Sequence, residues 1–330
     1  MILVTGGTGL VGAHLLLHLL ENGETVRAIY RTEANCNKTK NLFSLYKKEY
    51  LFSAIEWVHA DILDLPSLEV AFREVIFVYH CAAIVSFSPD DEKIIRKTNI
   101  EGTANIVNLC LANNIQKLCH VSSIAALGTG APHETLITET TEWNPEQSHS
   151  DYGISKYGAE MEVWRGQQEG LKVVIVNPGI ILGPGFYSQG SGILFGIVKK
   201  GLRCYTLGTT GFVAIPDVVS TMYRLMKSNN CNERYVLVAN NLNFKEVLFT
   251  IADGLKMKRP RWYVSPLFSP FIWRIDALLV FLGIKKYTFS RFIANALHTK
   301  TYYSNEKITT ELKMTFIDSK KYIQSIAPYC

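Results

Sequence analysis

A tyrosine and a lysine four residues apart could together donate and accept a proton. In a helix these positions share one face, so the ammonium can stabilise an ionised phenol. A free phenol has a pKa of ~10, and ionisation near neutrality therefore requires about 4 kcal/mol. An ammonium ~5 Å away, at an effective dielectric constant of ~20, supplies about 3 kcal/mol. The chain contains three such pairs: Tyr152–Lys156, Tyr223–Lys227 and Tyr303–Lys307.

Position in the chain separates these three pairs. Tyr152 begins a predicted helix, residues 152–168, that lies between two predicted strands. Open α/β sheets bind ligands at the carboxyl ends of their strands, and this helix starts at that edge. The other two pairs lie later in the chain. We therefore expect Tyr152 and Lys156 to be catalytic, and the other pairs to be ordinary surface or packing pairs.

A serine at the end of the preceding strand could supply a third catalytic group. The predicted strand ends in His120-Val121-Ser122-Ser123, and the last hydroxyl can hydrogen-bond and polarise a substrate oxygen. Ser123 is therefore our candidate, whereas Ser122 is interpreted as capping a turn. For Asn99 two interpretations stay open: it fixes a backbone group or a water on the far side of the lysine, or it is purely structural.

The start of the chain predicts a strand, a glycine-rich turn and a helix. Gly7, Gly9 and Gly12 satisfy the pattern GxGxxG. A helix N-terminus attracts a pyrophosphate, and glycines let the backbone approach it closely. A dinucleotide cofactor is therefore expected, held by Thr5, Gly6, Gly7, Thr8, Gly9, Leu10, Val11 and Gly12.

The second predicted strand indicates which dinucleotide is bound. A carboxylate at its end would select NAD through the ribose 2′-hydroxyl, but the sequence offers Arg31, with Lys38 beyond it. A guanidinium suits the 2′-phosphate of NADP, so NADP is expected. NAD stays possible, with Glu33 as a late acidic substitute.

Two further strand ends supply weaker candidates. Asp61 and Ile62 follow the third predicted strand, where they could contact the adenine. Ala82 and Ala83 end the fourth, where small side chains let the cofactor pass closely.

Strands alternating with helices position all of these residues. Strands are predicted at residues 2–5, 25–30, 55–59, 77–83, 117–122 and 172–177, and helices at 11–22, 66–75, 90–113 and 152–168, with a polar insertion after residue 30. This alternation predicts a Rossmann-type, doubly wound parallel α/β sheet. We assign residues 1–178 to it, rejoined by about 205–230, and residues 179–330 mainly to a smaller C-terminal substrate-binding lobe.

Composition excludes several other classes of protein. With 330 residues, 48% hydrophobic and 19% charged, the chain is neither disordered nor a coiled coil. A net charge of +5 without a long basic run does not indicate a nucleic-acid partner. Seven cysteines without a CxxC pair favour reduced thiols in the cytoplasm and no metal site.

One late segment raises the question of a membrane. Residues 266–284 are strongly apolar, but Pro270, Arg274 and Asp276 interrupt them. A transmembrane helix needs ~20 mostly uncharged residues. We therefore expect a core or lid helix, with a membrane-surface helix as the alternative, and no integral membrane segment.

Taken together, the motifs resemble the extended short-chain dehydrogenase/reductase family, which includes nucleotide-sugar epimerases and dehydratases. Besides the glycine turn and the tyrosine–lysine pair, the matching segments are Asp61-Ile62, His80–Ala83, Asn99–Thr103, Ser122-Ser123, Asn177-Pro178-Gly179 and Phe212–Val218. Arg31, Lys38 and Asn177-Pro178 look most like the dihydroflavonol-4-reductase and 3β-hydroxysteroid dehydrogenase branch.

The resemblance implies hydride transfer between a nicotinamide and a carbonyl or secondary alcohol of a small, hydrophobic substrate. In it, Tyr152 passes the proton, Lys156 lowers the phenol pKa and holds the nicotinamide ribose, and Ser123 holds the substrate oxygen. Asn99 and Pro178 join the cofactor contacts, and a homodimer is possible. Two alternatives stay open: an epimerase or dehydratase with tightly bound NAD, and a non-catalytic NAD(P)-binding protein.

Overall fold

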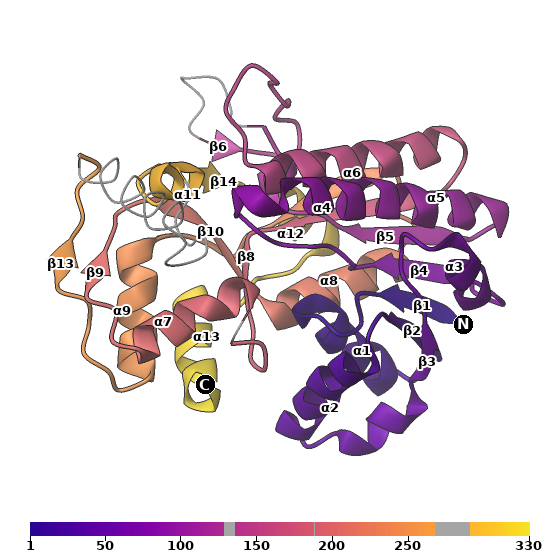
Figure 1. Ribbon diagram of the computed structural model, residues 1–330, viewed down its shortest axis with the longest axis horizontal. Helices are drawn as coiled ribbons and strands as arrows, with labels where there is room; N and C mark the ends of the chain where they lie inside the picture. The colour runs from indigo at the N-terminus through magenta and orange to yellow at the C-terminus, as the bar shows by residue number, and fades with distance from the viewer. Residues whose placement is uncertain (129–135, 188, 268–290) are drawn as a thin grey trace.

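A seven-stranded parallel sheet forms the centre of the protein (Figure 1). The computed structural model describes residues 1–128, 136–187, 189–267 and 291–330. The strand order is β11-β7-β5-β4-β1-β2-β3, and every neighbouring pair is parallel. The strands are β1 (Ile2–Thr5), β2 (Val26–Tyr30), β3 (Glu56–His59), β4 (Phe77–His80), β5 (Lys117–Val121), β7 (Val173–Pro178) and β11 (Glu233–Leu237).

Helices cover both faces of this sheet. They are α1 (Leu10–Glu21), α2 (Cys36–Leu45), α3 (Leu65–Ala71), α4 (Glu92–Arg96), α5 (Gly102–Ala112), α6 (Asp151–Gln168) and α8 (Ile215–Lys227). Side chains alternate between the faces of a strand. In β1, Ile2 and Val4 join one buried apolar cluster with α1 and α8, whereas Leu3 joins a second with α3, α5 and α6. Figure 1 shows α5 and α6 on one side of the strands and α1 and α8 on the other. The predicted doubly wound α/β fold is confirmed.

The chain reverses its direction of winding at β1, which pairs with both β2 and β4. The helices that follow these strands must therefore leave towards opposite faces. In such sheets the carboxyl edge at the reversal opens into a crevice. The glycine turn leaves β1 at this edge, and Arg31 and Ala82 follow β2 and β4 there.

A smaller α/β lobe lies at one end of the sheet (Figure 1). Its three-stranded sheet has the order β12-β10-β8 and shares a buried core with α7, α9 and α13. The elements are β8 (Ile180–Leu182), α7 (Ile193–Lys199), β10 (Thr209–Ala214), β12 (Asn240–Asn243), α9 (Phe244–Gly254) and α13 (Ser319–Ile326). Shorter elements complete this part: β6 (Leu136–Ile137), β9 (Cys204–Tyr205), β13 (Trp262–Tyr263), α11 (Arg291–Ala296), β14 (Tyr302–Tyr303) and α12 (Glu306–Leu312).

Two elements differ from the sequence-based expectation. The polar insertion after β2 contains α2, whose Leu42 and Phe43 are buried and whose Thr39 hydroxyl donates to the Gly7 carbonyl at 2.8 Å. These long-range contacts, not a strong apolar period, stabilise the helix. The long helix expected at residues 90–113 is α4 and α5 joined by a π-helical turn, Lys97–Glu101. Such turns re-aim side chains and are frequent at functional sites.

The apolar segment at residues 266–284 falls almost wholly outside the described residues, so its interpretation stays a prediction. In the part of the chain that the structure describes, no helix has the length and apolarity to span a bilayer.

Candidate active site

The glycine turn after β1 is held by close backbone contacts. Gly6 has φ +70°, which favours glycine, and a Cβ on it would lie 2.7 Å from the Ala82 nitrogen. A Cβ on Gly12 would overlap the Gly6 carbonyl oxygen, so α1 packs directly on the turn. Gly9 is different, because its nearest protein atom would be the Gly6 oxygen, at 3.5 Å. The turn is therefore tight on its protein side and open at Gly9.

The open side of the turn suits an anion. Gly9 is the N-cap of α1, and the first turn of that helix contains no acidic residue. Unpaired N–H groups and the helix dipole favour negative charge at such an end. A Cβ on Gly9 would occupy the space in front of these groups. The residues present therefore fit the pyrophosphate of a dinucleotide.

Thr5 takes part in a buried hydrogen-bond chain beneath this turn. The Thr103 hydroxyl donates to the Asn99 carbonyl at 2.6 Å, so it accepts from Nε2 of His80 at 2.9 Å. Nδ1 of His80 then accepts from the Thr5 hydroxyl at 2.7 Å, which itself accepts from the Ala82 N–H. Burial, with Lys156 nearby, lowers the pKa of His80 to about 3. These hydrogen bonds connect the carboxyl ends of β1 and β4 to the π-helical turn through the neutral imidazole of His80.

The residues expected to select the cofactor lie on the surface beside β2 and β3. Arg31 and Lys38 are exposed, and in the described chain neither has an ion-pair partner. Glu33 is exposed as well. Asp61 is half-buried, and its carboxylate accepts from the Leu63 N–H at 3.0 Å. Ile62 is buried against Gly102, where a Cβ would collide with its side chain.

Asn99 fixes the loop that contains Ala82 and Ala83. It accepts from the Ile84 N–H at 2.8 Å and donates to the Ile84 carbonyl at 3.0 Å. It also donates to the Ser155 hydroxyl on α6 at 2.9 Å. Asn99 is only 1% exposed, and its amide connects the loop after β4 to Ser155 on α6.

Tyr152 and Ser123 are brought together by α6 and β5. Ser150 caps α6, and this cap starts the helix so that Tyr152 lies in its first turn. Burial raises the pKa of Tyr152 to about 12, and a hydrogen bond with the Ser123 hydroxyl offsets part of that rise. Phe87 packs edge-on against the phenol, with ring centroids 5.6 Å apart. The phenol is therefore protonated at neutral pH.

Lys156 lies one turn further along α6 and is 3% exposed. Its ammonium donates to the Val121 carbonyl at the end of β5, at 2.7 Å. Burial lowers its pKa to about 8, and Glu160 counteracts part of that change. In the chain without cofactor, burial raises the pKa of the phenol. The lowering of that pKa by Lys156 stays a prediction for the cofactor-bound protein. The ammonium is hydrogen-bonded to β5 and the phenol is desolvated.

The other two tyrosine–lysine pairs lie elsewhere. Tyr223 and Lys227 on α8 both contact Glu24, at 3.2 Å and 2.6 Å. Tyr303 belongs to β14 and Lys307 to α12, so they do not share one helix. Pro178 is buried at the end of β7, where it pairs with Leu237.

Sequence reasoning missed a second group of buried polar residues near Lys156. Glu160 is fully buried on α6, and Asn177 and Arg234 contact its two carboxylate oxygens. Glu160 could have been found from its spacing, four residues after Lys156 on the same helix face. No local pattern marks Arg234, because β11 joins the sheet from a distant part of the chain.

A family model described as the NAD dependent epimerase/dehydratase family matches residues 2–237, which end at the last residue of β11. This match spans most of the chain, including the glycine turn and α6. The protein belongs to the NAD dependent epimerase/dehydratase family. The resemblance stated from the motifs is thereby confirmed, and NAD(P) is the cofactor of the family.

Members of this family with reductase names are similar over most of the chain. Anthocyanidin reductase of Arabidopsis thaliana is 28% identical over 288 residues, 81% of this chain and 82% of that protein. The bifunctional dihydroflavonol 4-reductase/flavanone 4-reductase of Malus domestica is 29% identical over 289 residues, 81% of this chain and 78% of that protein. The crystal structure of a UDP-glucose 4-epimerase from Thermotoga maritima with UDP-glucose has a TM-score of 0.77 at 19% identity, covering 99% of this chain and 97% of that one. That last likeness shows the fold alone.

Proposed function

We propose that this family member is an NAD(P)-dependent oxidoreductase that transfers a hydride between the nicotinamide and a carbonyl or secondary alcohol of a small, apolar substrate. The observation that carries the proposal is the convergence of Ser123, Tyr152 and Lys156 between β5 and α6, on the same edge of the sheet as the glycine turn. The reductase names of the relatives agree with it. In this proposal the large sheet binds the cofactor and the smaller lobe binds the substrate.

The residues of this chain have separate tasks in the mechanism. The glycine turn and the N-terminus of α1 bind the pyrophosphate. A bound nicotinamide supplies or accepts the hydride. Tyr152, protonated because of its raised pKa, donates the phenolic proton to the carbonyl oxygen in the reduction direction. The Ser123 hydroxyl donates a hydrogen bond to that oxygen, and Lys156 holds the nicotinamide ribose.

We propose NADP as the preferred cofactor. Arg31 is exposed directly after β2, and no ion-pair partner in the described chain competes for its guanidinium. A guanidinium–phosphate hydrogen bond contributes about 1.5–3 kcal/mol. We expect Arg31→Ala to weaken NADPH binding by about 10- to 100-fold and to leave NADH binding within about twofold. Equal losses for both cofactors would refute this preference, and Lys47→Ala, an exposed cation just after the end of α2, is the control.

An apolar substrate is favoured by the side chains beside the phenol. Phe87 packs on Tyr152 and is 43% exposed, and Val85 on the same loop is 53% exposed. A sugar nucleotide would leave these apolar groups against polar hydroxyls, whereas an apolar ketone would bury them. The relatives' names, with flavonoid substrates, point the same way.

The alternative is an epimerase or dehydratase that retains NAD, which the description of the matching family model names. One experiment separates the two. The purified protein is assayed for bound nucleotide, then for NADPH oxidation with a panel of apolar ketones. Turnover of NADPH supports the proposal. Retained NAD with no NADPH consumption, together with conversion of a UDP-sugar, would overturn it.

Assembly and location are part of the same proposal. We infer a homodimer in the cytoplasm, based on the family resemblance and the free cysteines. Light scattering coupled to size exclusion measures the oligomeric state, and a monomer at micromolar concentration would contradict the dimer.

A further inference from the structure

A buried carboxylate lies directly behind the candidate catalytic residues. Glu160 has 0% exposed surface and follows Lys156 by one turn of α6. Residues with this spacing have Cβ atoms about 5–6 Å apart on one helix face. A buried carboxylate is costly unless it is paired and hydrogen-bonded, so its partners indicate what it is for.

The partners of Glu160 come from two other strands. The Asn177 amide on β7 donates to one carboxylate oxygen and also to the Ser123 carbonyl, at 3.1 Å. The Arg234 guanidinium on β11 lies 3.4 Å from the other oxygen. One amide therefore connects the carboxylate to the turn that presents the candidate catalytic serine.

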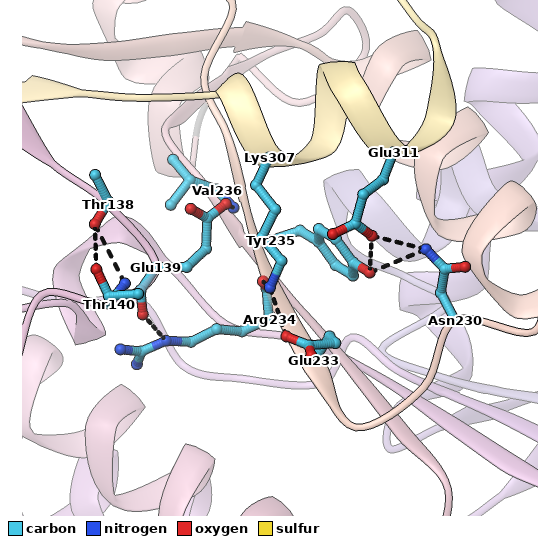
Figure 2. A network of polar contacts seen from close by, with 10 residues as sticks. All are labelled: Thr138, Glu139, Thr140, Asn230, Glu233, Arg234, Tyr235, Val236, Lys307 and Glu311. Carbon is cyan, nitrogen blue, oxygen red and sulfur yellow. Dashed lines mark hydrogen bonds and ion pairs between the residues drawn. The ribbon is translucent and has the colours of Figure 1, made fainter.

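Arg234 is itself held in place, as Figure 2 shows. Its Nε donates to the Glu139 carbonyl at 2.7 Å, and its Nη2 donates to the Thr141 carbonyl at 3.3 Å. The Glu139 carboxylate in turn accepts from the Val236 N–H at 2.8 Å. The guanidinium is thus fixed from both the strand and the loop before α6, and it stays beside Glu160.

Glu160 also determines the charge around Lys156. From β4 and β5, the ammonium is faced by His80 and His120, both kept neutral because burial lowers their pKa far below its usual range. Burial raises the pKa of Cys81 to about 12, so this thiol is neutral as well. Burial raises the pKa of Glu160, and the Arg234 guanidinium and the Asn177 amide counteract that rise because they favour the ionised carboxylate. Of the titratable groups that act on Lys156 in the described chain, Glu160 is therefore the group that can supply a negative charge.

We propose that Glu160 is a positioning residue for the reaction, whose carboxylate unites Lys156 on α6, the Ser123 turn after β5 and Arg234 on β11 into one unit. This inference rests on the proposed function, because it assigns Glu160 a task through the candidate catalytic groups. Two effects follow. Glu160 keeps the ammonium charged at the pH at which it holds the cofactor, and through Asn177 it keeps Ser123 in line with Tyr152.

The test measures NADPH affinity from pH 6 to pH 10.5 by quenching of protein fluorescence. In the wild-type protein we expect affinity to fall as Lys156 loses its proton, with a midpoint near pH 8. Glu160→Gln removes the nearby negative charge and should lower this midpoint by about one to two pH units. Glu160→Asp retains the charge and should restore at least half of that shift. Lys156→Met should have no such step.

Controls separate positioning from folding. Glu162→Gln changes a partly exposed carboxylate on another face of α6 and should retain the wild-type midpoint. The double variant Glu160→Gln with Arg234→Met removes both charges of this ion pair. This double variant should recover most of the thermal stability lost in Glu160→Gln alone. Its pH midpoint of NADPH affinity should stay as low as in Glu160→Gln.

The outcomes distinguish this inference from the function on which it rests. If Lys156→Met loses the step but Glu160→Gln keeps the wild-type midpoint, the positioning role is refuted and the proposed function stands. If the wild-type protein binds neither NADPH nor NADH, the proposed function fails and this inference with it. If Glu160→Asp behaves like Glu160→Gln, the shape of the side chain and not its charge is decisive, and the role in keeping Lys156 charged is refuted.

Discussion

Replacing Lys156 with methionine should abolish turnover and yet stabilise the protein. Burial lowers the pKa of Lys156 from 10.5 to about 8. Each pH unit between the folded and unfolded values corresponds to about 1.4 kcal/mol, so keeping the ammonium charged in the fold costs about 3 kcal/mol. Methionine has a similar length and carries no charge. The buried Val121 carbonyl loses its charged donor, which costs about 1–3 kcal/mol, so the net gain should be about 0–2 kcal/mol at pH 7.

The sign of the pH dependence provides the sharper check. Below pH 8 the lysine is charged in both the folded and the unfolded chain, so the full cost is present. Between pH 8 and pH 10.5 the unfolded chain binds a proton that the folded chain has released, and stability therefore rises with pH. The advantage of Lys156→Met should accordingly shrink over this window and vanish above it.

Urea titrations at pH 7 and pH 10.5 measure the free energy of unfolding of both proteins. Lys172→Met, at an exposed position before β7, is the control and should change that free energy by less than about 0.5 kcal/mol. The reasoning would be refuted if Lys156→Met lost more than 1 kcal/mol at pH 7. It would also fail if the gain were equal at the two pH values.

Three further outcomes are expected from the site. Gly9→Ala should leave the unfolding temperature of the free protein nearly unchanged but weaken NADPH binding at least tenfold. Gly12→Ala, whose Cβ would overlap the Gly6 carbonyl, should destabilise the free protein by about 1–3 kcal/mol in urea titrations. A larger loss of stability in Gly9→Ala than in Gly12→Ala would contradict the assigned geometry. Tyr152→Phe should lower kcat by about 10²- to 10⁴-fold in NADPH-oxidation assays while NADPH affinity changes less than threefold, and a kcat within threefold of wild type would remove the phenol from the mechanism. The His80 ring, with a pKa of about 3, should show no titration between pH 5 and pH 9 in NMR spectra, and a midpoint inside that range would contradict the neutral hydrogen-bond chain.

The sequence predicted best what short-range physics determines. The strands before the glycine turn and before α6 follow from apolar runs bounded by glycine, proline or polar residues, and their ends agree with the structure within a few residues. Tyr152 was distinguished from the two other pairs by its place after a strand. These features depend on residues that lie close together in the chain.

Features created by distant contacts were not predictable in the same way. α2 lacks a strong apolar period and depends on Thr39 meeting the glycine turn. The pKa of Tyr152 in the free chain depends on how deeply α6 packs, because burial is what raises it. Arg234 lies beside Glu160 because β11 pairs with β7. No local sequence pattern predicts that pairing.

The position of β11 also constrains how the protein can be made. Its strand comes from residues beyond β8 and β10, yet it hydrogen-bonds with β7 along Val174–Pro178. During synthesis, the first six strands of the large sheet therefore leave the ribosome before β11, and β7 stays an unpaired apolar edge until β11 has been translated. Such an edge can recruit a strand from another molecule. The cofactor half consequently depends on the rest of the chain to close its sheet, and a fragment truncated after β7 would be prone to aggregation.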